Sequence, residues 1–231
     1  MERFSLQDRQ CFCSADTTPQ AMLIQPIGEH EANSLEQELS ILSSSICPPF
    51  LFAAFEVQDW NRELSPWEAP PVFGSDPFGH DAPSTLDFIL NHLLPHLRQK
   101  HSLPSDIPVI LGGYSLAALF SLWSAYNTDA FKAIAAASPS VWFPNWLDYV
   151  RQNPLLADAV YLSLGDKEAR SRNPILASVE QCIAEQYRIL QEIPAASSIL
   201  EWNHGNHFKE PERRTAKAFR WCLNTTLIRM Q

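Results

Sequence analysis

The chain has 231 residues, of which 45% are hydrophobic and 19% charged, and a formal net charge of -9 at pH 7. This composition excludes a disordered or fibrous protein and suffices for one substantial hydrophobic core. The acidic balance argues against nucleic-acid binding, which needs a clustered positive surface to displace counterions from phosphates. We therefore expect a single domain covering residues 1–231.

The N-terminal segment MERFSLQDRQ carries charges and lacks the apolar stretch of a secretory signal. No apolar run approaches the length of a membrane span, so we expect a cytoplasmic protein without a membrane partner. The five cysteines are scattered along the chain. Cys11 and Cys13 are spaced like half of a metal site, but no second pair of ligands accompanies them, and we expect no metal.

Apolar patterning predicts two strands near the N-terminus, near 10–13 and over 21–27, followed by a helix over 33–42 with leucines along one side. The segment PFLFAAFEV, residues 49–57, is an almost continuous apolar run. Such a run is typical of a central strand buried on both faces. The next segment, 59–79, is rich in aromatic residues and proline and predicts an irregular loop.

The middle of the chain predicts a helix, a strand and a second helix in succession. The first helix begins at Pro83, with Ser84 as its N-cap. Asp87 in the first turn is placed to accept a hydrogen bond from the N-cap backbone N–H. A buried strand over 107–111 follows, and the residues after Ser115 are good helix formers. Ser115 is therefore predicted to stand where a strand becomes a helix.

The same alternation continues to the C-terminus. We expect strands over 131–137, 159–164 and 197–202, and helices over 175–190 and 210–228. Strands separated by helices at these distances predict right-handed crossovers and a mostly parallel sheet with helices on both faces. The expected class is α/β, and functional groups should gather at the carboxyl ends of the strands.

The stretch GGYSLAAL, residues 112–119, places Ser115 between small residues at this junction. The pattern G-x-S-x-G allows a tight turn that exposes a nucleophilic serine, and here Ala117 replaces its last glycine. A serine hydroxyl becomes a good nucleophile only with a base that takes its proton and a group that orients that base. Ser115 is our candidate nucleophile.

Candidates for the base and the acid follow later strands. The segment EWNHGNHF, residues 201–208, offers two histidines, and we favour His207 as the general base over His204 because it lies deeper in the turn. Asp166 follows the strand 159–164 after one glycine and is the favoured acid, with Glu168 as the alternative from the same turn. The chain order serine, acid, histidine is that of α/β-hydrolases.

An oxyanion hole needs two backbone N–H groups. We expect one from Leu116, directly after the nucleophile, and one from Asp59 or Trp60 in the loop after the strand 49–57.

The chain resembles the esterase family of α/β-hydrolases that includes esterase D-like enzymes and the siderophore (enterochelin) esterases. The likeness runs from about Phe50 onward, and it is carried by GYSLAAL, AAASPSVWF, SLGDKE and GNHF. It implies an α/β-hydrolase fold without a large cap domain, and a serine esterase with Ser115 as nucleophile and His207 as base. Some siderophore esterases work with serine and histidine alone, which leaves the acid open.

The resemblance also implies that Ser138, Ser140 and Trp142 lie near the substrate, and we expect Tyr114 and Trp67 to contribute to substrate binding. The expected partner is a small-molecule ester, and the triad chemistry requires no cofactor. Two alternatives use the same chain: a non-catalytic scaffold, in which His207 would point away from Ser115, and an acyltransferase with the same triad.

Overall fold

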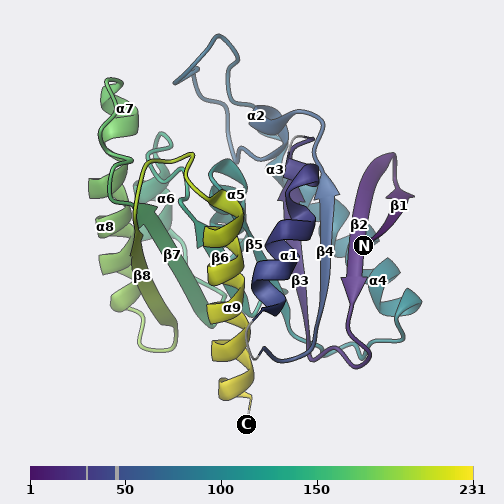
Figure 1. Ribbon diagram of the computed structural model, residues 1–231. Coiled ribbons are helices and arrows are strands. Elements are labelled where there is room, and N and C mark those ends of the chain that lie inside the picture. Colours follow the sequence, from purple (N-terminus) through teal and green to yellow (C-terminus); the bar gives the residue numbers. More distant parts are fainter. Residues whose placement is uncertain (30, 45–46, 231) are drawn as a thin grey trace.

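The computed structural model describes residues 1–29, 31–44 and 47–230, and within these ranges the chain forms an eight-stranded sheet (Figure 1). The strand order is β1-β2-β4-β3-β5-β6-β7-β8. The strands are β1 (Glu2–Leu6), β2 (Arg9–Ala15), β3 (Ala21–Ile27), β4 (Phe50–Glu56), β5 (Val109–Tyr114), β6 (Ala133–Ala137), β7 (Ala159–Gly165) and β8 (Ser197–Asn203).

The strands β4, β3, β5, β6, β7 and β8 run parallel, whereas β1 and β2 form an antiparallel edge next to β4. The strands β3 to β7 are almost wholly buried because helices cover both faces of the sheet. The expected α/β class is confirmed. Strand β1 escaped the sequence analysis because it lies at a solvent-exposed edge and contains no run of buried apolar residues.

Helices α1 and α9 lie side by side on one face of the sheet (Figure 1). The apolar cluster on the other face includes residues of α3, α4, α5, α6 and α8. The helices are α1 (Leu35–Ser43), α2 (Trp60–Glu63), α3 (Ala82–Phe88), α4 (Leu94–Lys100), α5 (Leu116–Ser124), α6 (Trp146–Gln152), α7 (Pro174–Ala177), α8 (Val179–Gln191) and α9 (Pro211–Arg229). None of the helices in the described ranges is both long and apolar enough to cross a lipid bilayer.

Helix α3 begins earlier than its sequence pattern predicts. Its N-cap is Asp81, and Pro83 lies in the first turn. N–H groups in the first turn have no partner within the helix, so the missing N–H of proline costs no hydrogen bond there. The predicted capping role of Ser84 is therefore wrong. A π-helical turn, η2 (Ile89–Leu93), separates α3 from α4, and Pro95 is the second residue of α4. Proline cannot donate to the carbonyl one turn earlier, and a local change of helix pitch accommodates that loss.

The carboxyl ends of the parallel strands lie at the upper edge of the sheet in Figure 1, and the connection from α2 to α3 extends above them. It holds the aromatic and proline-rich segment predicted to be irregular, and α2 is a single short turn within it. No cap domain is inserted in the part of the chain that the structure describes. The upper edge is where a site would be assembled.

A buried acid on α1 makes the stability of this fold depend on pH. Glu38 is buried against β3 and accepts a hydrogen bond from Gln25 Nε2 at 3.3 Å. Burial raises the pKa of Glu38 from 4.5 to about 8, because the hydrogen bond does not replace the lost hydration. The native state therefore holds a proton that the unfolded chain releases above pH 4.5.

We expect the free energy of unfolding of the wild-type protein to fall, relative to that of Glu38→Gln, as the pH rises from about 4.5 to about 8, and the difference to level off above that range. A shift of this size corresponds to a few kcal/mol. Urea unfolding across the pH range measures it. Glu36→Gln, an exposed position on the same helix, is the control. A difference between wild type and Glu38→Gln that does not change with pH would contradict the prediction.

Candidate active site

Ser115 lies on a sharp turn between β5 and α5. Its backbone dihedral angles, φ 58° and ψ -117°, fall outside the regions that residues with a side chain normally adopt. Backbone strain of this kind is retained where the surrounding structure holds it, and it is concentrated at functional sites. The Ser115 N–H donates to Ala137 O at 3.1 Å, and its carbonyl accepts from Ser140 N at 3.1 Å, so β6 and the loop after it hold the turn.

The small residues around Ser115 allow this turn because the backbone segments approach each other closely. A Cβ atom on Gly113 would lie 2.8 Å from the Cβ of Ala117, and one on Gly112 would lie 2.7 Å from the Cβ of Ala135. The methyl group of Ala117 therefore occupies the space that Gly113 leaves open. The turn tolerates alanine at the position where the common motif has its second glycine.

His207, on the loop between β8 and α9, contacts Ser115 directly. Its Nε2 lies 3.0 Å from Ser115 Oγ, and its Nδ1 lies 2.7 Å from Glu168 Oε2. With its proton on Nδ1, the ring donates to the Glu168 carboxylate and accepts from the serine hydroxyl. The chain thus brings together a hydroxyl, an imidazole and a carboxylate from the ends of β5, β8 and β7, in the arrangement of an activated nucleophile.

The acid beside His207 is Glu168 and not the favoured Asp166. Both follow β7, but the chain turns back after Gly165, with a hydrogen bond from Glu168 N to Gly165 O at 3.1 Å. This turn directs the Glu168 side chain inward, where only 4% of it is exposed, whereas 47% of the Asp166 side chain is exposed. The expectation for Asp166 is corrected in favour of its alternative.

Asp166 instead ties together the two loops that carry the acid and the histidine. Its Oδ1 accepts from Gly205 N at 2.7 Å and its Oδ2 lies 3.2 Å from His204 Nδ1. The bond from Gly205 N, with help from His204, lowers the pKa of Asp166. The second candidate histidine, His204, is largely exposed and belongs to this outer pair.

Glu168 is held by donors on every side. Its Oε1 accepts from Gly165 N at 2.7 Å, Ser138 Oγ at 2.8 Å and Arg214 Nη1 at 2.8 Å. Burial by itself raises the pKa of Glu168, but the bond and charge of His207 and the bonds from Gly165 and Ser138 outweigh it, so the pKa lies below its ordinary value. The carboxylate therefore stays ionised beside the imidazole.

Arg214, near the start of α9, connects the acid to the histidine loop. Its side chain is 3% exposed, and its second terminal nitrogen, Nη2, donates to Asn206 O at 3.0 Å and to His204 O at 3.3 Å. Tyr114 accepts from Arg214 Nη1 at 3.0 Å and donates to His207 O at 2.6 Å. Tyr114, expected to bind substrate, is therefore buried beneath the histidine loop and supports it instead.

A cavity of about 500 Å³ opens onto Ser115 and His207. It is lined by Phe73, Ser115, Ser138, Pro139, Trp142, Lys167, Glu168, Arg170, Ser171, Leu176, Val179, Asn206, His207 and Phe208. Trp142 and Ser138 are among them, as expected, although the Ser138 hydroxyl is already bonded to Glu168. Ser140 lies close by, with its Oγ 3.4 Å from Ser115 Oγ.

Contrary to expectation, Trp67 is not one of the described residues that line this cavity. Its Nε1 donates to Pro144 O at 2.9 Å, and its ring packs against Phe143 and Tyr149. It therefore anchors the segment that follows Trp142 rather than the substrate. The sequence could not separate these roles because an aromatic loop residue serves packing and binding equally well.

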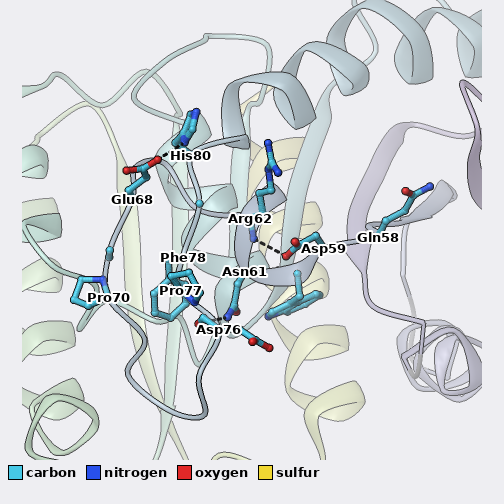
Figure 2. Close-up of a pocket in the computed structure, with 13 residues that line it drawn as sticks. Gln58, Asp59, Asn61, Arg62, Glu68, Pro70, Asp76, Pro77, Phe78 and His80 are labelled. Atoms are coloured by element: carbon cyan, nitrogen blue, oxygen red, sulfur yellow. Dashed lines mark hydrogen bonds and ion pairs between the residues drawn. The ribbon is translucent and has the colours of Figure 1, made fainter.

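The loop expected to supply the second oxyanion donor, at Asp59 or Trp60, also lies elsewhere than expected. The Asp59 N–H already donates to Glu63 Oε1 at 2.9 Å, and β3 lies between β5 and the strand β4 that leads to Asp59. Figure 2 shows Asp59 with Asn61 and Arg62 in a separate, more open cavity of about 1170 Å³, which Trp60 also lines. Leu116 is the first residue of α5, so its N–H has no carbonyl one turn earlier in the helix.

The sequence analysis missed Arg214 and the exposed cavity residue Phe208. The sequence around Arg214 shows only that a basic residue stands seven positions after His207, in the first turns of a predicted helix. Its role depends on how α9 packs against the ends of β5 and β7, which no local pattern contains.

No protein-family model matches the chain, and a search of curated protein sequences finds no significant match. Solved structures do match it. A siderophore hydrolase EstB from Aspergillus nidulans superimposes with a TM-score of 0.77 at 16% identity, covering 97% of this chain and 95% of that one. The siderophore hydrolase EstA from the same organism has a TM-score of 0.75 at 19% identity, with 94% and 90% covered.

An IroE-like serine hydrolase from Shewanella oneidensis has a TM-score of 0.76 at 15% identity, covering 94% of this chain and 76% of that one. At sequence identities this low, these superpositions show the fold alone. Together with the strand order, the helices on both faces and the strand-to-helix turn at Ser115, they show that the chain has the α/β-hydrolase fold.

Proposed function

We propose that the protein is a serine esterase that cleaves a carboxylic ester through an acyl-enzyme on Ser115. The observation that carries the proposal is the continuous contact from Ser115 Oγ to His207 Nε2, at 3.0 Å, and from His207 Nδ1 to Glu168 Oε2, at 2.7 Å. The serine hydrolase and siderophore hydrolases of the same fold support the reaction class. The ester itself is a small molecule that fits the cavity of about 500 Å³.

In the proposed reaction, Ser115 Oγ attacks the ester carbonyl carbon while its proton passes to His207 Nε2. The carbonyl electron pair moves onto oxygen, and the Leu116 N–H at the start of α5 stabilises the oxyanion. Glu168 orients the ring and stabilises the imidazolium. Collapse of the tetrahedral intermediate expels the alcohol, which takes the proton from His207 and leaves the acyl group on Ser115.

Deacylation repeats these steps with water. His207 takes a proton from the water, whose oxygen attacks the acyl carbon, and Ser115 leaves as its hydroxyl after receiving that proton. This chemistry explains why the acid and the histidine loop are tied together by Arg214, since the base must serve two successive proton transfers in one position.

A fluorophosphonate probe is expected to label the protein at one residue, and Ser115→Ala is expected to abolish the labelling and the hydrolysis of short aryl esters. Circular dichroism and thermal unfolding show whether the variant keeps its fold. Ser140→Ala, which removes the neighbouring hydroxyl, should still be labelled. Labelling that survives in a folded Ser115→Ala variant would sink the proposal, and so would the absence of any labelling in the wild-type protein.

The two alternatives make different demands. A non-catalytic scaffold needs the serine and the histidine apart, and the 3.0 Å contact between Ser115 and His207 argues against it. An acyltransferase would use the same residues and deliver the acyl group to an alcohol or thiol. Product analysis with added acceptors distinguishes it, and we expect the free acid to dominate.

A further inference from the structure

Two basic side chains at the cavity of Ser115 lack an acidic partner. Lys167 and Arg170, on the loop between β7 and α7, both line the cavity. Neither has a carboxylate within ion-pair distance in the ranges 1–29, 31–44 and 47–230. Their loop also carries the two acids Asp166 and Glu168, which form their direct contacts with other groups, Asp166 with His204 and Glu168 with His207 and Arg214. The charge of Lys167 helps to lower the pKa of Asp166 from beyond ion-pair distance.

The two cations stand against the overall charge of the chain, which has 26 acidic and only 17 basic residues. Some basic side chains elsewhere form ion pairs, as Arg9 does with Glu63 and Arg62 with Asp81, and others outside the cavity, such as Arg172, form none among the described residues. What sets Lys167 and Arg170 apart is that both line the cavity of Ser115. The charge of Glu168 is offset locally by Arg214, which lies outside the cavity lining. The cavity therefore presents a positive charge in a protein whose total charge is negative.

Much of the remaining cavity wall is apolar and partly exposed. Phe208 is 86% exposed and Phe73 56% exposed, and Trp142, Leu176 and Val179 complete the wall. Beside apolar surface, water is partly excluded, and a charge on a bound molecule interacts with the cations more strongly than in bulk solvent. An apolar cavity with cations at one side fits a molecule with an apolar body and an anionic end.

We propose that the substrate of this esterase is anionic: an ester whose acyl or alcohol part carries a carboxylate or a similar charged oxygen group, held by Lys167 and Arg170. This inference rests on the proposed function, because it concerns the same cavity. The two cations bind the charged end of the substrate and so set which part of it lies beside Ser115. They take no part in the proton transfers.

The test compares matched esters that differ only in charge. One pair carries the charge in the alcohol part, an acetylated hydroxyphenylpropionate and its primary amide. The other carries it in the acyl part, monophenyl adipate and its primary amide. We expect kcat/KM to favour the anion over the amide by roughly tenfold in at least one pair at low salt, and the preference to shrink as salt is added.

The variants Lys167→Gln, Arg170→Gln and their combination are expected to lower this preference stepwise, to about one in the double variant, as measured by the ratio of kcat/KM for the anion to kcat/KM for the amide. Arg172→Gln is the matched control, since it removes the same charge from the same loop at a residue outside the cavity lining. A preference of the wild-type protein for the neutral ester in both pairs would overturn the proposal. A preference for the anion that remains unchanged in the double variant would overturn it as well. Absence of hydrolysis of all four esters by the wild-type protein would instead count against the esterase function itself.

Discussion

Glu168→Gln is expected to lower kcat for ester hydrolysis by roughly 10³-fold to 10⁴-fold, the size of effect seen when the acid of a serine hydrolase triad is made neutral. Glutamine cannot stabilise the imidazolium, and its amide group would favour the wrong tautomer of His207. The 2.7 Å contact between His207 Nδ1 and Glu168 Oε2 is the one that the substitution alters. Steady-state kinetics with a short aryl ester measures the loss.

Asp166→Asn is the matched control, because it makes the same chemical change on the same loop. Asp166 contacts His204 and Gly205 and not His207, so we expect kcat to stay within about tenfold of the wild-type value. A pattern in which Asp166→Asn is the more damaging of the two would show that the assignment of Glu168 is wrong. Equal and small effects would indicate that serine and histidine suffice without an acid.

Arg214→Met is expected to lower the free energy of unfolding by about 3–5 kcal/mol at pH 7, because it leaves the buried Glu168 carboxylate without its cation. The side chains of Glu168 and Arg214 are 4% and 3% exposed, so water cannot replace the lost partner. The same change removes the bonds from Arg214 to Asn206 O and His204 O that hold the histidine loop. Urea unfolding gives the stability, and kcat should fall with the loop displaced.

Two further variants separate this effect from a general loss of packing. Arg213→Met changes the adjacent, largely exposed arginine, and its effect should stay within about 0.5 kcal/mol. Glu168→Gln combined with Arg214→Met removes both buried charges and should be more stable than Arg214→Met alone. The cost of Arg214→Met should also shrink at low pH, where the unpaired carboxylate becomes protonated. A double variant less stable than Arg214→Met would contradict the ion-pair explanation.

Much of the fold was predictable because its signals are local. Continuous apolar runs such as 49–57 and 107–111 are typical of strands buried on both faces, and they largely coincide with β4 and β5. Their spacing requires crossovers through helices. The positions of Ser115 and His207 could be predicted for the same reason, since each follows a strand whose carboxyl end lies at the upper edge of the sheet. The exposed edge strand β1 was missed because its pattern carries no buried run.

The residues that the sequence misassigned all depend on contacts between distant segments. The loop at Asp59 was expected beside the nucleophile, but strand adjacency is a property of the assembled sheet, and β3 occupies that place. Tyr114 precedes Ser115 in the chain and lies next to the site, yet its side chain points beneath the histidine loop, because Tyr114 ends β5 and packs on the side of the sheet that α9 covers.

The sequence by itself determined the class of fold, the turn at Ser115 and the histidine that follows the last strand, because strand burial and small residues at a tight turn leave a local pattern. Only the tertiary structure decided which acid serves that histidine. Asp166 and Glu168 lie two residues apart after the same strand, and the turn at Gly165 together with Arg214 from α9 selects Glu168 for the buried position. That selection rests on a charge brought from 46 residues further along the chain, which local patterning cannot encode.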